Sequence, residues 1–264
     1  MKLAMTIRLF PLLAAVLIPA AAAAGDAINA DRPGIADGSM VVGSGRFQIE
    51  TGLQQEFRDR LGEKTHTVFV PTLLRLGLSE AWEMRIESNA HTWARVTAAD
   101  GTFTKSSGDA PVSIGAKYHF QDADSTHPSL GVIARIFPRS GSGDYRTRHT
   151  TGDVRLVADW DFADDWSLNP NIGVARYEDG AGQVFSAGLF AATLSYNVSK
   201  TLNLFLDGAA QTLEKKNGKT MTMYDAGITY QMTPDTQLDF SVGIRGRGDT
   251  PANQFIGAGL SVRF

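Results

Sequence analysis

Apolar and polar residues alternate along most of the chain, in runs of about ten positions. A period of two is typical of β-strands whose two faces meet different surroundings. The last run shows this pattern clearly, because Ile256, Leu260 and Phe264 fall on one face while Gly257, Gly259, Ser261 and Arg263 fall on the other. Helical periodicity is scarce. We therefore expect an all-β protein.

Turn residues divide these runs into twelve expected strands. They cover residues 45–57, 64–78, 82–97, 110–121, 128–139, 152–162, 166–178, 183–197, 202–214, 220–232, 236–247 and 254–264. Tight connections alternate with looser polar ones, the latter around 98–109, 140–151 and 248–253. This layout predicts a closed antiparallel transmembrane β-barrel of about twelve strands, with short periplasmic turns and longer extracellular loops.

We expect irregular strand geometry in one strand whose alternation breaks and at three prolines. The strand that begins at Trp82 loses its alternation midway and would turn Trp93 towards the lumen, which indicates a bulge or a shifted phase. Pro71, Pro138 and Pro170 lie inside expected strands, where proline removes a hydrogen bond of the ladder. We expect each proline to mark a bulge or a strand end.

Aromatic residues gather at one end of the apolar face, beside the short turns or the C-terminus. A membrane barrel needs amphipathic rings at the bilayer interface, whereas a soluble core places its rings at strand centres. The expected interface aromatics are Trp82, Tyr118, Phe120, Trp160, Phe162, Trp166, Tyr196, Tyr230 and Phe264.

The opposite face carries many charges, which would be costly to bury in a dry core. We expect these side chains to line a lumen, where they can be hydrated and can pair across the interior. They are Glu50, Arg75, Glu83, Arg85, Glu87, Lys117, Arg135, Arg155, Asp159, Asp207, Asp225, Asp239, Arg245 and Arg263.

The N-terminus predicts export. Residues 1–24 have the form of a cleaved secretory signal, with Lys2 and Arg8 before a short apolar run and alanines at its end. We expect three regions: this signal peptide, an N-terminal periplasmic segment over 25–44 that folds into the periplasmic mouth as a plug or anchor, and the barrel over 45–264. The expected location is the outer membrane.

Composition narrows the chemistry. The 264 residues include no cysteine, which excludes thiolate metal sites, iron–sulfur clusters and cysteine nucleophiles. The balance of 25 Lys and Arg against 28 Asp and Glu argues against a nucleic-acid partner. The histidines are scattered, so we expect no metal site, and we expect no cofactor. A basic loop with Arg146 and Arg148 is a candidate contact for lipopolysaccharide phosphates, although a solvated loop is the favoured interpretation.

The first part of the mature chain resembles a known family. Asp31-Arg32-Pro33 followed by Gly45-Arg46-Phe47-Gln48-Ile49-Glu50 is similar to the Asp-Arg-Pro and Gly-x-Phe-Gln-Leu/Ile-Glu segments of outer-membrane proteins assigned to the meta-cleavage pathway of phenol degradation. Members are often labelled outer-membrane transporters. Ala30 and Gly34 depart from the usual hydroxyl and acidic neighbours of the Asp-Arg-Pro segment. The resemblance implies a barrel that admits small aromatic or hydrophobic molecules.

The C-terminus resembles the sorting signal read by the barrel-assembly machinery, through Gly259, Val262 and Phe264. Gly257 stands where that signal usually has a polar residue. The resemblance implies that this machinery and the outer-membrane lipids are partners.

We expect a passive channel for small solutes and not an enzyme. Two alternatives stay open. One is a structural or surface-binding barrel whose lumen is closed by its own salt bridges. The other, less favoured, is an outer-membrane lipid hydrolase that would use His127 and Ser129, since its chemistry needs a serine within hydrogen-bond reach of a histidine.

Overall fold

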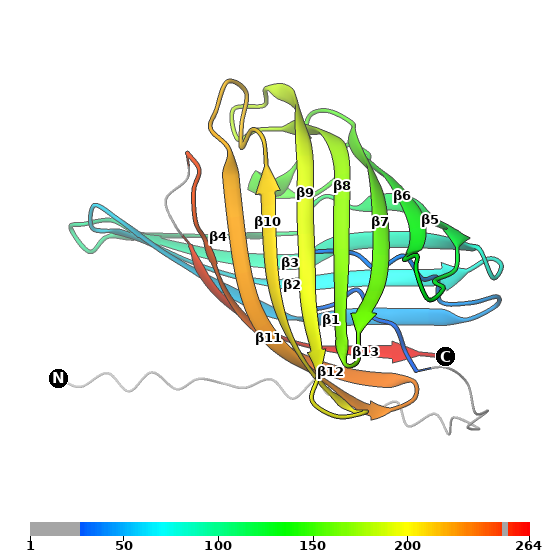
Figure 1. The fold of residues 1–264 in the computed structure, drawn as a ribbon. Helices are drawn as coiled ribbons and strands as arrows, with labels where there is room; N and C mark the ends of the chain where they lie inside the picture. Colours follow the sequence, from blue (N-terminus) through cyan, green and yellow to red (C-terminus); the bar gives the residue numbers. More distant parts are fainter. Residues whose placement is uncertain (1–26, 250–252) are drawn as a thin grey trace.

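The computed structural model describes residues 27–249 and 253–264, so the expected signal peptide lies outside the described residues. Nearly all regular structure in the described part is strand (Figure 1). The strands are β1 (Phe47–Arg60), β2 (Glu63–Gly77), β3 (Trp82–Thr97), β4 (Phe103–Gly108), β5 (Ser113–Gln121), β6 (Ser129–Phe137), β7 (Thr151–Ala163), β8 (Trp166–Glu178), β9 (Val184–Asn197), β10 (Leu202–Gln211), β11 (Met221–Thr233), β12 (Thr236–Arg245) and β13 (Gln254–Arg263). One short 3₁₀ turn, η1 (Gly143–Tyr145), lies between β6 and β7. Across the described ranges, no helix has the length and apolar character to cross a membrane.

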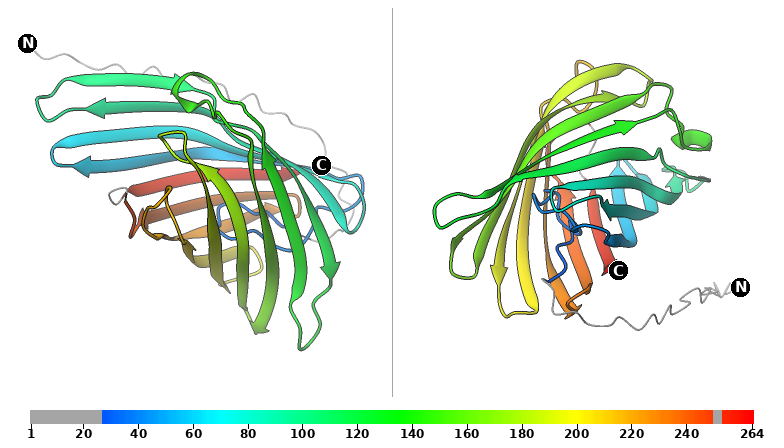
Figure 2. Two further views of the ribbon diagram at one scale, coloured as in Figure 1. Left: turned by 90° about the horizontal axis from the view of Figure 1, so that it is seen from above. Right: turned by 90° about the vertical axis from the view of Figure 1, so that its right-hand side faces the viewer.

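The sheet closes into a ring. Neighbouring strands pair antiparallel, β1 pairs with β13, and β2 pairs with β3, which joins the two ends. Twelve strands form the barrel, as the sequence predicts, and β4 is an additional strand that pairs with β3. The β1–β2 and β3–β4 hairpins extend well beyond the other strands (Figures 1 and 2).

β4 lies in a stretch that we predicted to be a loop, and that prediction is wrong. β3 is long enough to serve two neighbours: its first part, 82–87, pairs with β5, and its last part, 92–97, pairs with β4. The β4 sequence is short and polar because both of its faces are largely exposed. It therefore lacks the apolar alternation that reveals the other strands.

The predicted irregularity in β3 is confirmed. The register between β2 and β3 shifts by one residue between Phe69 and Pro71. Because of this shift Thr92, 4% exposed, faces inward, and Trp93, 47% exposed, faces outward. Pro71 thus marks a bulge.

The other two prolines differ from each other. Pro138 directly follows β6, as predicted. Pro170 neither ends β8 nor shifts its register, so that expectation is wrong. It pairs with Ala192 of β9, whereas the β7–β8 ladder omits Ala158 and Asp159 opposite it. The missing N–H of Pro170 therefore interrupts the ladder with β7 and leaves the ladder with β9 continuous.

The outer wall of the barrel is apolar. Large exposed side chains such as Leu156, Ile172, Val174 and Leu206 cover it between the strand ends. A closed ladder satisfies the backbone groups, and an apolar wall suits hydrocarbon, so this architecture is that of an outer-membrane barrel.

The aromatic residues that we predicted for the interface lie on this outer wall. Trp82 stacks on Tyr118 with ring centroids 4.5 Å apart, and Trp166 contacts Tyr196 at 4.8 Å. The remaining exposed rings of the set are Phe120, Trp160, Phe162, Tyr230 and Phe264.

Candidate functional site

Residues 27–44, here called the N-terminal segment, lie inside the barrel (Figure 2, dark blue). The segment has no strand pairing of its own, so its backbone N–H groups need other partners. Wall carboxylates provide them. The N–H of Ile35 donates to Asp207 at 2.8 Å, and the N–H of Ser39 donates to Asp159 at 2.7 Å. The segment is therefore fitted to this wall.

Arg32 of the segment packs against glycines of the wall. Its guanidinium donates to Asp239 on β12 at 2.9 Å. Gly52 of β1 and Gly259 of β13 are register partners beside it, and a Cβ at either position would collide with the guanidinium. Close approach of the segment thus requires glycine at these two wall positions.

Asp31 lies among three buried cations. Its carboxylate accepts from Arg85 at 2.5 Å and Lys117 at 3.1 Å, and Arg75 is 3.6 Å away. Burial raises the pKa of Asp31, but the charges of Arg75, Lys117 and Arg85 outweigh this and hold the pKa well below its usual value. The carboxylate is therefore ionised and fully engaged at neutral pH.

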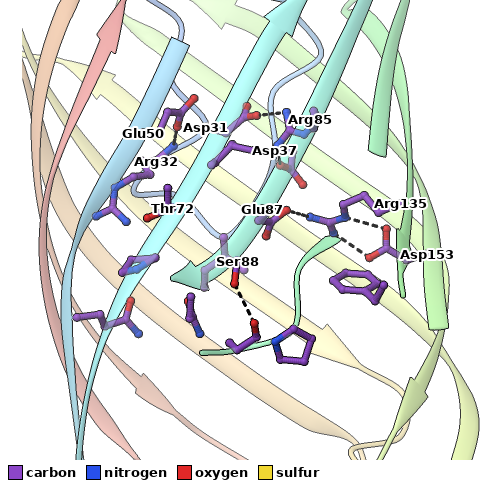
Figure 3. A pocket seen from close by; sticks show the side chains of 18 of the residues that line it. Asp31, Arg32, Asp37, Glu50, Thr72, Arg85, Glu87, Ser88, Arg135 and Asp153 are labelled. Carbon is purple, nitrogen blue, oxygen red and sulfur yellow. Dashed lines mark hydrogen bonds and ion pairs between the residues drawn. The ribbon is translucent and has the colours of Figure 1, made fainter. Parts of the chain in front are cut away.

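Asp37 makes a second bridge to the same part of the wall (Figure 3). It contacts Arg85 at 3.0 Å and Arg155 at 3.3 Å. Arg85 therefore binds both acidic residues of the segment, and it is only 1% exposed.

The wall beside the segment is itself a network of ion pairs. Arg75 binds Glu50 at 3.0 Å and Glu83 at 2.9 Å. Arg135 binds Asp153 at 2.8 Å and Glu87 at 2.7 Å, so Glu87 pairs across strands and not with its neighbour Arg85. These charges are packed and largely buried, whereas the sequence led us to expect hydrated ones.

The opposite part of the wall is acidic. Asp207 of β10 and Asp225 of β11 are register partners, and both are buried. Asp239 lies on the next strand and meets Arg32 of the segment. The N-terminal segment therefore lies between a cation-rich wall of β2–β7 and a carboxylate wall of β10–β12.

The structure places all the predicted lumen residues on the inner face, although their surroundings differ. Arg245 pairs with Glu214 at 2.9 Å near the loops, and Arg263 pairs with Asp235 at 2.7 Å near the turns. The inner set comprises Glu50, Arg75, Glu83, Arg85, Glu87, Lys117, Arg135, Arg155, Asp159, Asp207, Asp225, Asp239, Arg245 and Arg263.

Two cavities meet at the N-terminal segment. The first, about 640 Å³, lies towards the long loops and is lined by many charged side chains together with apolar ones such as Leu73, Phe137 and Phe255. The second, about 540 Å³, lies towards the short turns and is lined by polar residues such as Ser167 and Asn203. Residues 31–34 line both cavities. The segment thus forms the partition between them.

Sequence reasoning singled out Asp31, Arg32 and Pro33 but missed Asp37 and Ser39. Asp37 carries one of the two bridges, and the Ser39 hydroxyl lies 2.6 Å from that of Ser129. No local pattern marked these two residues, because the segment has no alternation of apolar and polar positions.

The two residues that the hydrolase alternative would use contact different groups. His127 lies on an exposed turn and contacts Asp124 at 3.0 Å, whereas the Ser129 hydroxyl contacts Ser39 inside the barrel. In the part of the chain that is described, no three His, Cys, Asp or Glu side chains form a group that could hold a metal ion.

Comparison with known proteins decides the family. Residues 30–264 match the model of the family described as "Putative MetA-pathway of phenol degradation". The chain belongs to this family. The match begins at the N-terminal segment and runs through the last strand, so the phenol-degradation family model includes both the segment and the barrel. No curated protein sequence matches the chain.

Solved structures share the fold of this family member. An outer-membrane channel from Pseudomonas putida F1 has a TM-score of 0.66 at 11% identity, with 86% of this chain and 98% of that chain covered. The β domain of the Bordetella autotransporter BrkA has a TM-score of 0.52 at 14% identity, covering 84% and 100%. The transport unit of the Escherichia coli autotransporter AIDA-I has a TM-score of 0.51 at 10% identity, covering 90% and 93%. At these identities the likeness shows an outer-membrane barrel fold.

Proposed function

We propose that the protein is a passive outer-membrane channel for small molecules, with the N-terminal segment as its constriction. The observation that carries this proposal is the pair of cavities that lie towards opposite ends of the barrel and share residues 31–34 as their partition. A solute that crosses the barrel must pass this partition. Transport of this kind needs no catalytic step and no cofactor.

The proposed solutes are small aromatic or otherwise hydrophobic molecules. The family description names phenol degradation, and the channel from Pseudomonas putida F1 shares the fold. The cavity on the loop side offers such a solute apolar contacts from Leu73, Met223 and Phe255, which lie among many charged side chains.

The proposed division of the chain follows from this role. Residues 1–24 would direct export, residues 25–44 would form the constriction, and residues 45–264 would form the barrel. The aromatic rings on the outer wall would hold the barrel at the periplasmic interface of the bilayer. Gly259, Val262 and Phe264 would be read by the barrel-assembly machinery.

One observation favours a closed barrel as the second candidate. Arg75, Arg85 and Lys117 are almost completely buried in ion pairs, so this half of the lumen is packed like a core. A barrel of this kind would use its outer loops to hold a surface partner.

Liposome swelling separates the two candidates. Purified protein in liposomes is expected to give swelling with small solutes that a protein-free bilayer excludes. Single-channel recording in a planar bilayer is expected to show discrete conductance steps. Neither swelling nor conductance above that of protein-free membranes would contradict the channel and leave the closed barrel.

A further inference from the structure

The outward face of the projecting hairpins carries a row of basic side chains. Cross-strand register places His66 of β2 opposite Arg95 of β3, and Arg95 opposite Lys105 of β4. All three are exposed. Phe57 of β1, whose ring stacks on His66 at 4.8 Å, comes next in the row and is followed by Gln254 of β13.

This row lacks an acidic member. Like charges directly opposite each other destabilise a sheet. Arg95 and Lys105 both lie over the ring of Phe103, at 4.2 and 5.7 Å, which holds the two cations on one side of the hairpin. The nearest carboxylate in the next row, Asp59, lies 3.9 Å from Lys64. An anion bound between Arg95 and Lys105 would relieve their repulsion.

The height of the row fits the outer surface of the membrane. A barrel strand crosses the hydrocarbon in about 9–11 residues. Counted from the aromatic end at Phe47 and Trp82, that length ends near Phe57 and Trp93. Arg95 lies two residues beyond Trp93, so the basic row lies where lipid phosphates lie.

The row just below it, over β1–β4, has the polar Gln55 and Ser107 at its ends and apolar side chains between them. Val68 and Trp93 are register partners on the membrane side of His66 and Arg95. A ligand that suits both rows has a phosphate at the level of the cations and acyl chains below. Charge-assisted bonds from arginine and lysine to phosphate are among the strongest that proteins make.

We propose that His66, Arg95 and Lys105, called the basic row, bind the phosphate groups of lipid A, the anionic lipid of the outer leaflet. This surface is separate from the lumen, and it lies on a different part of the chain from the basic loop noted in the sequence.

The test is native mass spectrometry of the full mature chain in detergent with added diphosphoryl lipid A. The variant R95Q/K105Q is expected to bind lipid A at least about tenfold more weakly, because two charge-assisted bonds are lost. The matched control K216Q/K219Q, on the exposed β10–β11 loop, is expected to bind as the unaltered chain does. Unchanged affinity in R95Q/K105Q would overturn the proposal.

Two further arms keep the result specific. The charge-preserving variant R95K/K105R is expected to retain binding, and unheated gel migration verifies that each variant folds. Equal affinity for lipid A without phosphates, or for phosphatidylglycerol, would also overturn the assignment, because either result would mean that lipid A phosphates are not what the row recognises.

Discussion

At the scale of single residues, Arg85 links the N-terminal segment to the barrel wall. It binds Asp31 and Asp37 of the N-terminal segment as well as Glu83 of its own strand. Arg85→Gln would remove one cation from three buried carboxylates, which keep only their contacts with Arg75, Lys117 or Arg155, and we expect a cost of about 3 kcal/mol of stability. Urea unfolding in detergent should show this loss. Lys200→Gln, in an exposed turn, serves as the control, with a change within about 0.5 kcal/mol.

The two glycines beside Arg32 permit a second prediction at the same scale. Gly259→Ala would push a methyl group into the guanidinium and separate it from Asp239. We expect a loss of about 1–3 kcal/mol in the same unfolding measurement, together with a higher single-channel conductance. Gly257→Ala is the matched control on the same face of β13, since its nearest neighbour is the Ser241 hydroxyl at 3.3 Å. Equal effects of the two substitutions would refute the role of Arg32.

The acidic residues of the segment set a pH dependence. The pKa of Asp31 is held low in the folded protein. The contribution of Asp31 to stability is therefore fully present above about pH 3.9, the pKa of aspartate in the unfolded chain. This contribution is lost as pH falls through the lower pKa of the folded protein. We expect constant single-channel conductance from pH 8 to about pH 5, with an increase only at more acidic pH. A conductance step near neutral pH would show that another group controls the segment.

At the scale of elements, the sequence predicts the strands well and the N-terminal segment poorly. Strand faces follow from alternation, because a residue's direction is fixed by its neighbours in sequence. The bulge at Phe69–Pro71 was visible as a break in the same pattern. The segment has no alternation, and contacts such as Arg32 with Asp239 join residues 207 positions apart. Its route depends on side-chain fit that no local pattern encodes.

The segment can be tied to the barrel to test whether it moves. The chain has no cysteine, and the hydroxyl oxygens of Ser39 and Ser129 lie 2.6 Å apart. The double variant S39C/S129C should form a disulfide when oxidised. If solutes pass by displacement of the segment, oxidation lowers liposome swelling and reduction restores it. Swelling with each single-cysteine variant should not change on oxidation. Equal swelling rates of the oxidised and reduced double variant would mean that solutes pass without displacement of the segment.

At the scale of the whole molecule, the N-terminal segment both obstructs the lumen and contributes to the packing of the barrel interior. It divides the lumen into two cavities, and its two carboxylates contact Arg75, Arg85, Lys117 and Arg155 of the wall. Removal of residues 25–44 should therefore have two consequences. The single-channel conductance should rise several-fold, because the partition is gone. The folded form, which migrates faster on gels when unheated, should convert to the unfolded form at a lower temperature, because buried cations lose partners. A barrel that keeps its conductance and loses only stability would assign the segment to the core alone, whereas higher conductance at unchanged stability would make it a plug whose ion pairs add nothing to the fold.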